Sequence, residues 1–304
     1  MGCSSMTTFL PTIRQLQYLV ALNDHGHFGR AAEACFVSQS TLSAALRELE
    51  SHIGLTLVER TSRVVRFTPA GTAITDKARR VLREAGELAD MARAAGEPLV
   101  GELRMGVIPT IAPFLLPIVL PRLRERYPEL RLYLREEASQ VACESLQRGQ
   151  LDCVLLAMPF ACGDIDSEAL FDDPLVLAFP PGEKDVPATM SPNDLDPARL
   201  LLLEDGHCLQ DHALAACNRP NLQSGSMTLG TSLNTLVQMV ENGLGVTLIP
   251  QMAVDAGVLS YTGIQVRKLN SATATRQITL IWRRGSPRAK EFQLLAETLR
   301  PQKA

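Results

Sequence analysis

The sequence predicts an α+β module at the amino terminus, then a long helix, then a larger α/β domain. Three observations support this division. Short helical patterns and a basic hairpin fill residues 13–70, an apolar heptad seam runs through residues 69–96, and apolar runs alternate with helical stretches over residues 103–304. The 304 residues are 46% apolar, which is enough to fill substantial cores.

Three helices are expected in the amino-terminal module. Apolar positions in residues 16–22 follow helical spacing that ends at Gly26, and a second, shorter helix follows. Ser38 supplies a cap oxygen for the third helix, which Gly54 closes. The outward face of that third helix carries short polar groups and one cation: Gln39, Ser40, Thr41, Ser43 and Arg47.

Two short strands around a turn at Ser62 are expected next, and they carry Arg60, Arg63 and Arg66. A helix face of short hydrogen-bonding groups suits base edges in a DNA major groove, with the cap residue Ser38 near phosphate. Cations on a hairpin suit the DNA backbone. The order helix, turn, helix, basic hairpin therefore favours a DNA-binding module. The alternative is a small helical domain with a solvated polar face.

Thr68 and Pro69 predict the start of a long helix that continues through most of residues 69–96. Its apolar positions are spaced three and four residues apart and are mostly small: Ile74, Ala78, Val81, Ala85, Leu88, Ala92 and Ala95. Such a seam permits close approach of a second helix, so we expect dimerisation that pairs two DNA modules. The alternative is a helix that packs on its own domain.

Beyond a hinge at residues 96–102, the alternation of apolar runs and helical stretches predicts an α/β domain with largely parallel sheets. A Walker loop, a dinucleotide glycine motif and a nucleophile elbow are all missing from the sequence. Nucleotide-dependent and α/β-hydrolase chemistry therefore have no support in the sequence. We expect no enzymatic activity and no cofactor.

Composition bounds the location and the partners. The formal net charge of −3 provides no global basic field, so any nucleic-acid site has to be local. The seven cysteines are irregularly spaced, which does not fit a secreted disulfide scaffold, and we expect a reducing cytoplasm. No apolar run reaches about 18 residues, so no membrane association is expected. Residues 1–5 are interpreted as an extension before Met6.

The segment LLLLEDGHCLQDHALAAC, residues 200–217, predicts a buried strand, a turn and a helix. Cys208 at the helix N-terminus, beside His207, has two influences that favour the reactive thiolate. Cys217 lies nine residues on, which in a helix is roughly 13.5 Å of rise and half a turn out of phase. A disulfide needs Cα atoms roughly 4.4–6.8 Å apart. Joining these sulfurs would therefore require the helix to unwind, and oxidation would change the conformation.

Other interpretations of these cysteines remain open on geometry alone. Cysteines in apolar surroundings are most often small buried hydrophobic side chains. Cys208 and His212 share a helix face at a zinc-ligand spacing, but Cys217 lies on the other side, and we expect no metal. Three further cysteines are interpreted as structural: Cys143, Cys153 and Cys162.

The stretch FGRAAEACFVSQSTLSAALRELESHIGLTLVER resembles the winged helix-turn-helix of LysR-type transcriptional regulators, and the likeness covers residues 13–71. Ser40 departs from the pattern, because the family usually has proline there. The family pairs this module with an effector domain that resembles periplasmic binding proteins. The resemblance implies two subdomains joined by two crossover strands, the first at 103–171 plus 277–304 and the second at 172–276.

Residues 200–217, with TSLNTLVQMVENGLGVTLIP after them, resemble the hydrogen peroxide sensors of this family, including the Gly-His-Cys triplet. The resemblance implies that Cys208 is the peroxidatic thiol and Cys217 the resolving thiol of a reversible disulfide. Ser139 stands where relatives often have threonine. The implied surroundings of the peroxide and the thiolate are His207, Thr110, Ser139, Arg276, Thr231, Ser232 and Asp205.

The implied function is a peroxide-sensing regulator that binds promoter DNA and RNA polymerase and activates antioxidant genes. It would assemble as a dimer of dimers and would be reset by a thioredoxin or glutaredoxin system. Two alternatives remain. One is a LysR-type regulator for a small metabolite held near Thr110, Thr231 and Ser232, and the other is a thiol peroxidase.

Overall fold

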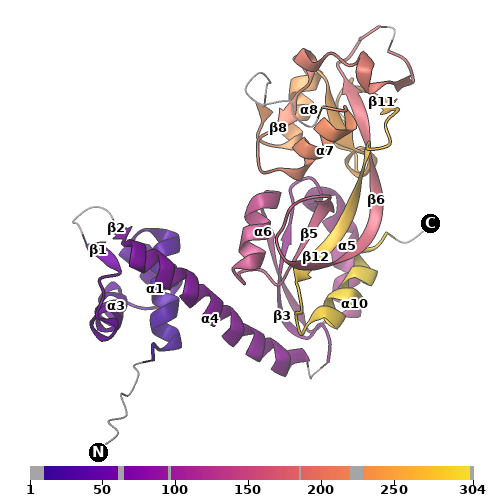
Figure 1. Cartoon of the computed structure of the whole chain (residues 1–304). Helices are drawn as coiled ribbons and strands as arrows, with labels where there is room; N and C mark the ends of the chain where they lie inside the picture. The colour runs from indigo at the N-terminus through magenta and orange to yellow at the C-terminus, as the bar shows by residue number, and fades with distance from the viewer. Residues whose placement is uncertain (1–9, 61–64, 95–96, 185, 220–228, 302–304) are drawn as a thin grey trace, which may run out of the picture. The chain divides into compact units, whose positions relative to one another are not determined.

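The structure, a computed structural model, describes residues 10–60, 65–94, 97–184, 186–219 and 229–301. Two compact units divide the chain, Met1–Asp90 and Met91–Ala304, and each is described by itself (Figure 1). Within the described ranges, no helix is both long enough and apolar enough to cross a lipid bilayer.

Three helices begin the described part of the first unit: α1 (Ile13–His25), α2 (Phe28–Ala34) and α3 (Gln39–Ile53). Their ends follow from local sequence. The hydroxyls of Thr12 and Ser38 accept backbone N–H groups in the first turns of α1 and α3. Gly26 and Gly54 end the same two helices in the left-handed conformation, as the sequence predicts.

An antiparallel hairpin of β1 (Val58–Arg60) and β2 (Val65–Phe67) follows α3. Glu50 on α3 holds the hairpin, because one of its carboxylate oxygens accepts the N–H groups of Leu57 and Val58 at 2.8 and 3.0 Å. The predicted order of helices and hairpin is confirmed. Two residues of the predicted turn lie outside the described part of the chain: Ser62 and Arg63.

α4 (Pro69–Ala94) is the predicted long helix, and its 26 residues span roughly 39 Å. Ile74 and Ala78, at the start of the predicted seam, contact the core of the first unit. Val81 and Leu88 are exposed instead, by 45% and 73% of their surface. The early seam therefore packs on its own unit, whereas later seam positions leave apolar surface uncovered. Two seam positions lie outside the side chains that the structure describes: Ala92 and Ala95.

The second unit contains an eight-stranded sheet with the order β4-β3-β5-β12-β6-β11-β7, and β10 also pairs with β6. Its strands are β3 (Gly101–Val107), β4 (Leu130–Glu136), β5 (Cys153–Met158), β6 (Ile165–Phe179), β7 (Thr189–Met190), β10 (Thr247–Pro250), β11 (Gln265–Leu269) and β12 (Thr275–Arg283). A separate parallel pair is formed by β8 (Leu202–Leu203) and β9 (Leu229–Gly230). The helices are α5 (Ala112–Arg126), α6 (Ser139–Gln147), α7 (Cys208–Ala216), α8 (Leu233–Glu241), α9 (Gln251–Asp255) and α10 (Ala289–Leu299).

The strand directions correct one expectation. β3 is parallel to both β4 and β5, but β12 is antiparallel to β5 and β6, and β10 and β11 are antiparallel to β6. The prediction of largely parallel sheets is therefore wrong for the middle of the sheet. The cause is topological, because β6 leaves the first half of the unit and β12 returns to it, so the two neighbours run in opposite directions.

Two apolar cores lie along these long strands. One core gathers side chains from β3, β5, α5 and α10, and the other gathers side chains from α7, α8 and β10. β6 serves both, since Leu170 belongs to the first core and residues 175–179 to the second. Figure 1 shows β6 and β12 side by side, running from the half with α5 and α10 to the half with α7 and α8.

Candidate redox site

α7 carries the two cysteines that the sequence singles out. The buried strand β8 leads into a turn in which Gly206 has φ +90°, a conformation that glycine adopts without strain. His207 is the N-cap residue, Cys208 is the first residue of α7, and Cys217 is the C-cap residue. The predicted strand, turn and helix over residues 200–217 are therefore confirmed in order.

The two thiols lie in different cores. Both cysteines are free and each has only 1% of its surface exposed. Cys208 packs into the core that contains β3 and β5, whereas Cys217 packs into the core that contains α8 and β10. With α7 intact, the sulfurs lie at opposite ends of a helix and in different apolar cores, and they cannot bond without a change of backbone.

Cys208 is surrounded by polar groups from several elements. Its N–H donates to the Ser139 hydroxyl at 3.1 Å, and Ser139 is the first residue of α6. Burial raises the pKa of the Cys208 thiol, while the Arg276 charge and hydrogen bonds from Ser139 and Ala157 lower it in part. The net direction is upward, so the protonated thiol is the resting form at neutral pH.

The raised pKa of the Cys208 thiol contradicts the expectation that its position at a helix N-terminus favours the thiolate. A helix N-terminus does favour thiolate, but burial is the largest influence on the Cys208 thiol and raises its pKa. His207 does not help, because burial lowers the pKa of its imidazole and keeps it neutral, with Glu204 opposing that shift only in part. The neighbouring positive charge comes instead from Arg276.

Arg276 is a fully buried cation held mainly by Asp173 and Thr110, with a longer contact from its Nη2 to the Met252 sulfur. Its Nε donates to an Asp173 carboxylate oxygen at 3.0 Å, and its Nη1 and Nη2 donate to the Thr110 hydroxyl and carbonyl at 2.7 and 2.9 Å. Burial raises the pKa of Asp173, and Arg276 together with the Met252 N–H opposes that rise. Thr110, Ser139, Arg276 and Cys208 thus lie together as predicted. Asp173 was missed by sequence reasoning, although a buried strand position occupied by aspartate was a usable sign.

Three other residues of the predicted surroundings contribute differently. Asp205 accepts a hydrogen bond from the Gln210 amide at 3.0 Å and so supports the first turn of α7. Ser232 caps α8, because its hydroxyl accepts the Thr235 N–H at 3.2 Å. Thr231 precedes that cap and is exposed. The structure therefore places Thr231 and Ser232 at the start of α8 rather than in the Arg276 cluster.

His212 lies in the middle of α7 and is engaged by the chain itself. Its Nε2 is 3.0 Å from the Pro159 carbonyl oxygen, and burial lowers the pKa of the imidazole to about 4. Among the described residues, no group of three or more His, Cys, Asp or Glu side chains could hold a metal ion. Cys217 differs again, because burial raises the pKa of its thiol to about 11, against a smaller lowering by Arg219.

The predicted DNA-contacting side chains lie on α3 and the hairpin. At the start of α3, the Ser38 hydroxyl is 2.8 Å from both the Ser40 and Thr41 hydroxyls, and these residues are exposed. Gln39, Arg47 and Arg66 are exposed as well, and Ser43 is half-buried. Arg63 and the side chain of Arg60 lie outside the described part.

Comparison with known proteins identifies the family. A model of the bacterial regulatory helix-turn-helix protein, lysR family, matches residues 13–72, and a model of the LysR substrate binding domain matches residues 96–304. The chain belongs to the LysR family. The predicted combination of a helix-turn-helix module and an α/β effector domain is thereby confirmed.

Individual LysR-family relatives cover nearly the whole chain. A hydrogen peroxide-inducible genes activator from Escherichia coli O6:H1 is 42% identical over 293 residues, 95% of this chain and 94% of its own. The transcriptional regulator EstR from Acinetobacter baylyi is 39% identical over 292 residues, 96% of this chain and 97% of its own. Among solved structures, a full-length OxyR variant from Pseudomonas aeruginosa matches with a TM-score of 0.75 and 33% identity, covering 96% and 95% of the two chains.

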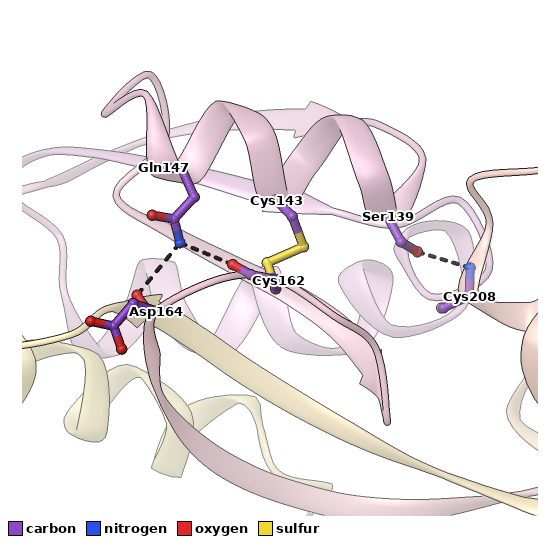
Figure 2. Close-up of a disulfide and its surroundings, with 6 residues drawn as sticks. All are labelled: Ser139, Cys143, Gln147, Cys162, Asp164 and Cys208. Carbon is purple, nitrogen blue, oxygen red and sulfur yellow. Dashed lines mark hydrogen bonds between the residues drawn. A yellow bond between two sulfur atoms is a disulfide. The ribbon is translucent and has the colours of Figure 1, made fainter. Parts of the chain in front are cut away.

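This LysR-family chain also contains a disulfide that sequence reasoning missed. Cys143 on α6 is bonded to Cys162 in the loop after β5, with Cα atoms 5.1 Å apart (Figure 2). The sequence led us to interpret both cysteines as structural, without pairing them. Their separation of 19 residues, with the whole of β5 between them, is no sign of contact until the packing of α6 is known. Cys153, the third of the set, is free and buried.

Proposed function

We propose that this LysR-family chain is a DNA-binding transcription regulator that senses hydrogen peroxide through a reversible Cys208–Cys217 disulfide. One observation carries the proposal: two buried free thiols stand at opposite ends of α7 and in different cores, with Arg276 and Ser139 acting on only one of them. The relative named as a hydrogen peroxide-inducible genes activator supports the choice of oxidant.

The chemistry begins at Cys208. The Arg276 charge and the hydrogen bond with Ser139 stabilise a minor thiolate population against the cost of burial. The thiolate attacks one peroxide oxygen, the O–O bond breaks, and the departing hydroxide takes a proton to become water. Cys208 is left as a sulfenic acid. The Thr110 hydroxyl, which accepts from Arg276, keeps its own proton available for the oxidant.

Cys217 then resolves the sulfenic acid. Its sulfur attacks the Cys208 sulfur, the S–O bond breaks, and a second water leaves, so that two thiols have reduced one peroxide to two waters. Because α7 separates the sulfurs by roughly 13.5 Å of rise, this step requires the helix to unwind. The unwinding is the conformational signal that we expect to reach the DNA module.

The remaining features belong to the same proposal. α3 binds the major groove through Gln39, Ser40, Thr41, Ser43 and Arg47, and the hairpin contacts phosphate through Arg60, Arg63 and Arg66. The chain works in a reducing cytoplasm as a dimer of dimers, contacts RNA polymerase and is reset by a thioredoxin or glutaredoxin system. The exposed apolar positions of α4 support pairing with a second helix. The effector domain divides into subdomains at 103–171 with 277–304 and at 172–276.

The test compares alanine variants of three buried free cysteines in transcription from a cognate promoter with purified RNA polymerase. Cys208→Ala and Cys217→Ala should abolish the response to peroxide while DNA binding remains. Cys153→Ala is the matched control, since Cys153 is equally buried but lies in β5, and it should respond normally. A full peroxide response in either of the first two variants would remove the proposal.

The same preparation separates the alternatives. A regulator of a small metabolite would respond to its ligand in Cys208→Ala as in the parent protein. A thiol peroxidase would consume peroxide in many turnovers with a reductant and would show no preference for promoter DNA over random sequence. The proposed sensor consumes one peroxide per cycle and binds its promoter selectively.

A further inference from the structure

The Cys143–Cys162 bond joins two segments that both hold α7. On one side, the first turn of α6 meets the start of α7, because Ser139 accepts the Cys208 N–H and the Gln140 N–H donates to the Gly206 carbonyl, each at 3.1 Å. On the other side, the Pro159 carbonyl, in the loop that leads to Cys162, lies 3.0 Å from His212 in the middle of α7. The bond therefore covalently links the two segments that contact the half of α7 that contains Cys208.

The geometry of α6 connects the bond at Cys143 with the reactive thiol of Cys208. Ser139 and Cys143 are four residues apart on α6, so they lie on one face, one turn apart. Figure 2 shows Cys143 bonded to Cys162 at one point of that helix and Ser139 meeting Cys208 a turn away. Gln147, a turn further on, donates to the Cys162 carbonyl at 2.9 Å. One α6 face thus carries both the bond and the Cys208 contact.

The bond also lies beside a cavity that is open to solvent. Cys143 and Cys162 are only 6% and 5% exposed, but both line an open cavity of about 290 Å³, together with Gln140 and Gln147. A cavity of this size suits a small thiol better than the rigid surface of a protein reductant. Disulfides in a reducing compartment are rare, and those that occur are mostly catalytic or redox-sensing.

We propose that Cys143 and Cys162 form a second, reversible redox site that exchanges with low-molecular-weight thiols of the glutathione class and sets the reactivity of Cys208 through Ser139. The exchange site stands on its own geometry, and only its effect on Cys208 rests on the proposed function. With the bond present, α6 holds Ser139 at Cys208 and favours the thiolate. With the bond reduced, α6 is no longer tied to the loop at residues 159–163, and Cys208 reacts more slowly.

The exchange balances without any other reactant. A small thiolate attacks one sulfur of the pair, the Cys143–Cys162 bond breaks, and the released cysteine sulfur takes a proton. A second small thiolate attacks the resulting mixed disulfide and releases the oxidised small disulfide, leaving two protein thiols. The reverse sequence restores the bond, so the ratio of small thiol to small disulfide determines its state.

The first experiment needs no peroxide chemistry. The full-length Cys208→Ala/Cys217→Ala variant, which retains the second pair, is equilibrated with defined mixtures of reduced and oxidised glutathione, alkylated and analysed by mass spectrometry. We expect Cys143 and Cys162 to pass together between bonded and alkylated forms as the mixture changes, while circular dichroism shows a folded chain. A pair that stays bonded at every ratio, stays reduced at every ratio, or opens only on unfolding overturns the inference and leaves the proposed function untouched.

The second experiment measures the effect on Cys208 in a Cys217→Ala background, which stops the reaction at the sulfenic acid. Cys143→Ala/Cys162→Ala should slow its formation about fivefold at neutral pH, the factor equivalent to one net hydrogen bond. It should also move the pH midpoint of Cys208 alkylation upward. Cys153→Ala is the control for loss of a buried thiol and should change neither quantity.

Ser139→Ala completes a double-mutant cycle. If the bond acts through Ser139, removing both the bond and the Ser139 hydroxyl should slow sulfenic acid formation no more than removing the hydroxyl alone. A bond that only stabilises the fold would lower the melting temperature but leave the pH midpoint in place, which overturns the coupling, as would strictly additive rate effects. If the alanine pair fails to fold, the same rates are measured on the parent cysteines, reduced and bonded by glutathione.

Discussion

Formation of the Cys208–Cys217 bond must destroy much of α7, and the size of the change follows from helix geometry. Nine residues at about 1.5 Å each separate the two Cα atoms by roughly 13.5 Å, on opposite sides of the helix axis. A disulfide tolerates at most about 6.8 Å, so the Cα atoms must approach by about 7 Å, which is more than the pitch of one helical turn. One sulfur must also leave its apolar core.

Hydrogen exchange with mass spectrometry measures this directly. Amides in residues 209–217 should be protected in the reduced protein and should exchange rapidly after peroxide, because the unwound segment loses its helical hydrogen bonds. α8 is an internal control of the same nine-residue length in the same core, and its amides should keep their protection. Cys208→Ala should show no change with peroxide.

A substitution in α7 tests whether the stability of the helix opposes formation of the Cys208–Cys217 bond. Ala215 is half-buried in α7, and Ala215→Gly should destabilise the helix by about 1 kcal/mol. If the bond requires unwinding, this change stabilises the oxidised form about fivefold and makes the reduction potential about 20 mV more negative. A Cys208–Cys217 peptide found by mass spectrometry together with unchanged protection in α7, or an unaltered potential in Ala215→Gly, would refute the unwinding argument.

Three further predictions concern charge, packing and pH. Arg276→Met removes the cation beside Cys208, so the pH midpoint of Cys208 alkylation should rise and oxidation should slow. Arg276→Lys should retain part of this electrostatic effect. An unchanged midpoint in Arg276→Met would show that Arg276 does not stabilise the Cys208 thiolate. A Cβ at Gly71 would meet a backbone oxygen at 2.0 Å, so Gly71→Ala should cost about 2 kcal/mol in denaturant unfolding. At Gly86 nothing lies within 4 Å, and Gly86→Ala should be neutral or stabilising; equal effects would contradict the packing argument. The folded-state pKa of His212, about 4, lies below its ordinary 6.5, so its contribution is present above pH 6.5 and lost as pH falls toward 4. The parent should therefore lose about 3 kcal/mol more than His212→Gln between pH 7 and pH 4, and equal losses would exclude that role.

Local chemistry explains which parts of the fold could be predicted. Caps at Thr12 and Ser38 and left-handed glycines at Gly26 and Gly54 define helix ends within a few residues of sequence. The same holds for α7, whose turn and N-terminus are encoded in residues 204–208. Strand direction is different, because β6 and β12 meet across about a hundred residues and nothing in either strand specifies its partner.

The positions of the candidate-site residues could be predicted, whereas their electrostatics could not. Cys208, Ser139, Thr110 and Arg276 were predicted through family resemblance, and they do lie together. Their electrostatic balance could not be predicted from spacing. The pKa of a thiol depends on how much of it the surrounding chain covers, and coverage is a property of tertiary packing. The bond between Cys143 and its partner was missed for the same reason, since the packing of α6 creates that contact.

Cys208 and the Cys143–Cys162 pair differ in their surroundings, and we expect them to react with different molecules. Cys208 has 1% of its surface exposed, so burial blocks a bulky thiol more strongly than a small uncharged oxidant such as peroxide. The raised pKa of its thiol slows its reaction with any oxidant. Cys143 and Cys162 instead face an open cavity of about 290 Å³, where a small thiol can enter. Because α6 touches both sites, the proposed exchange would let the thiol balance of the cell adjust the reactivity of Cys208 toward peroxide.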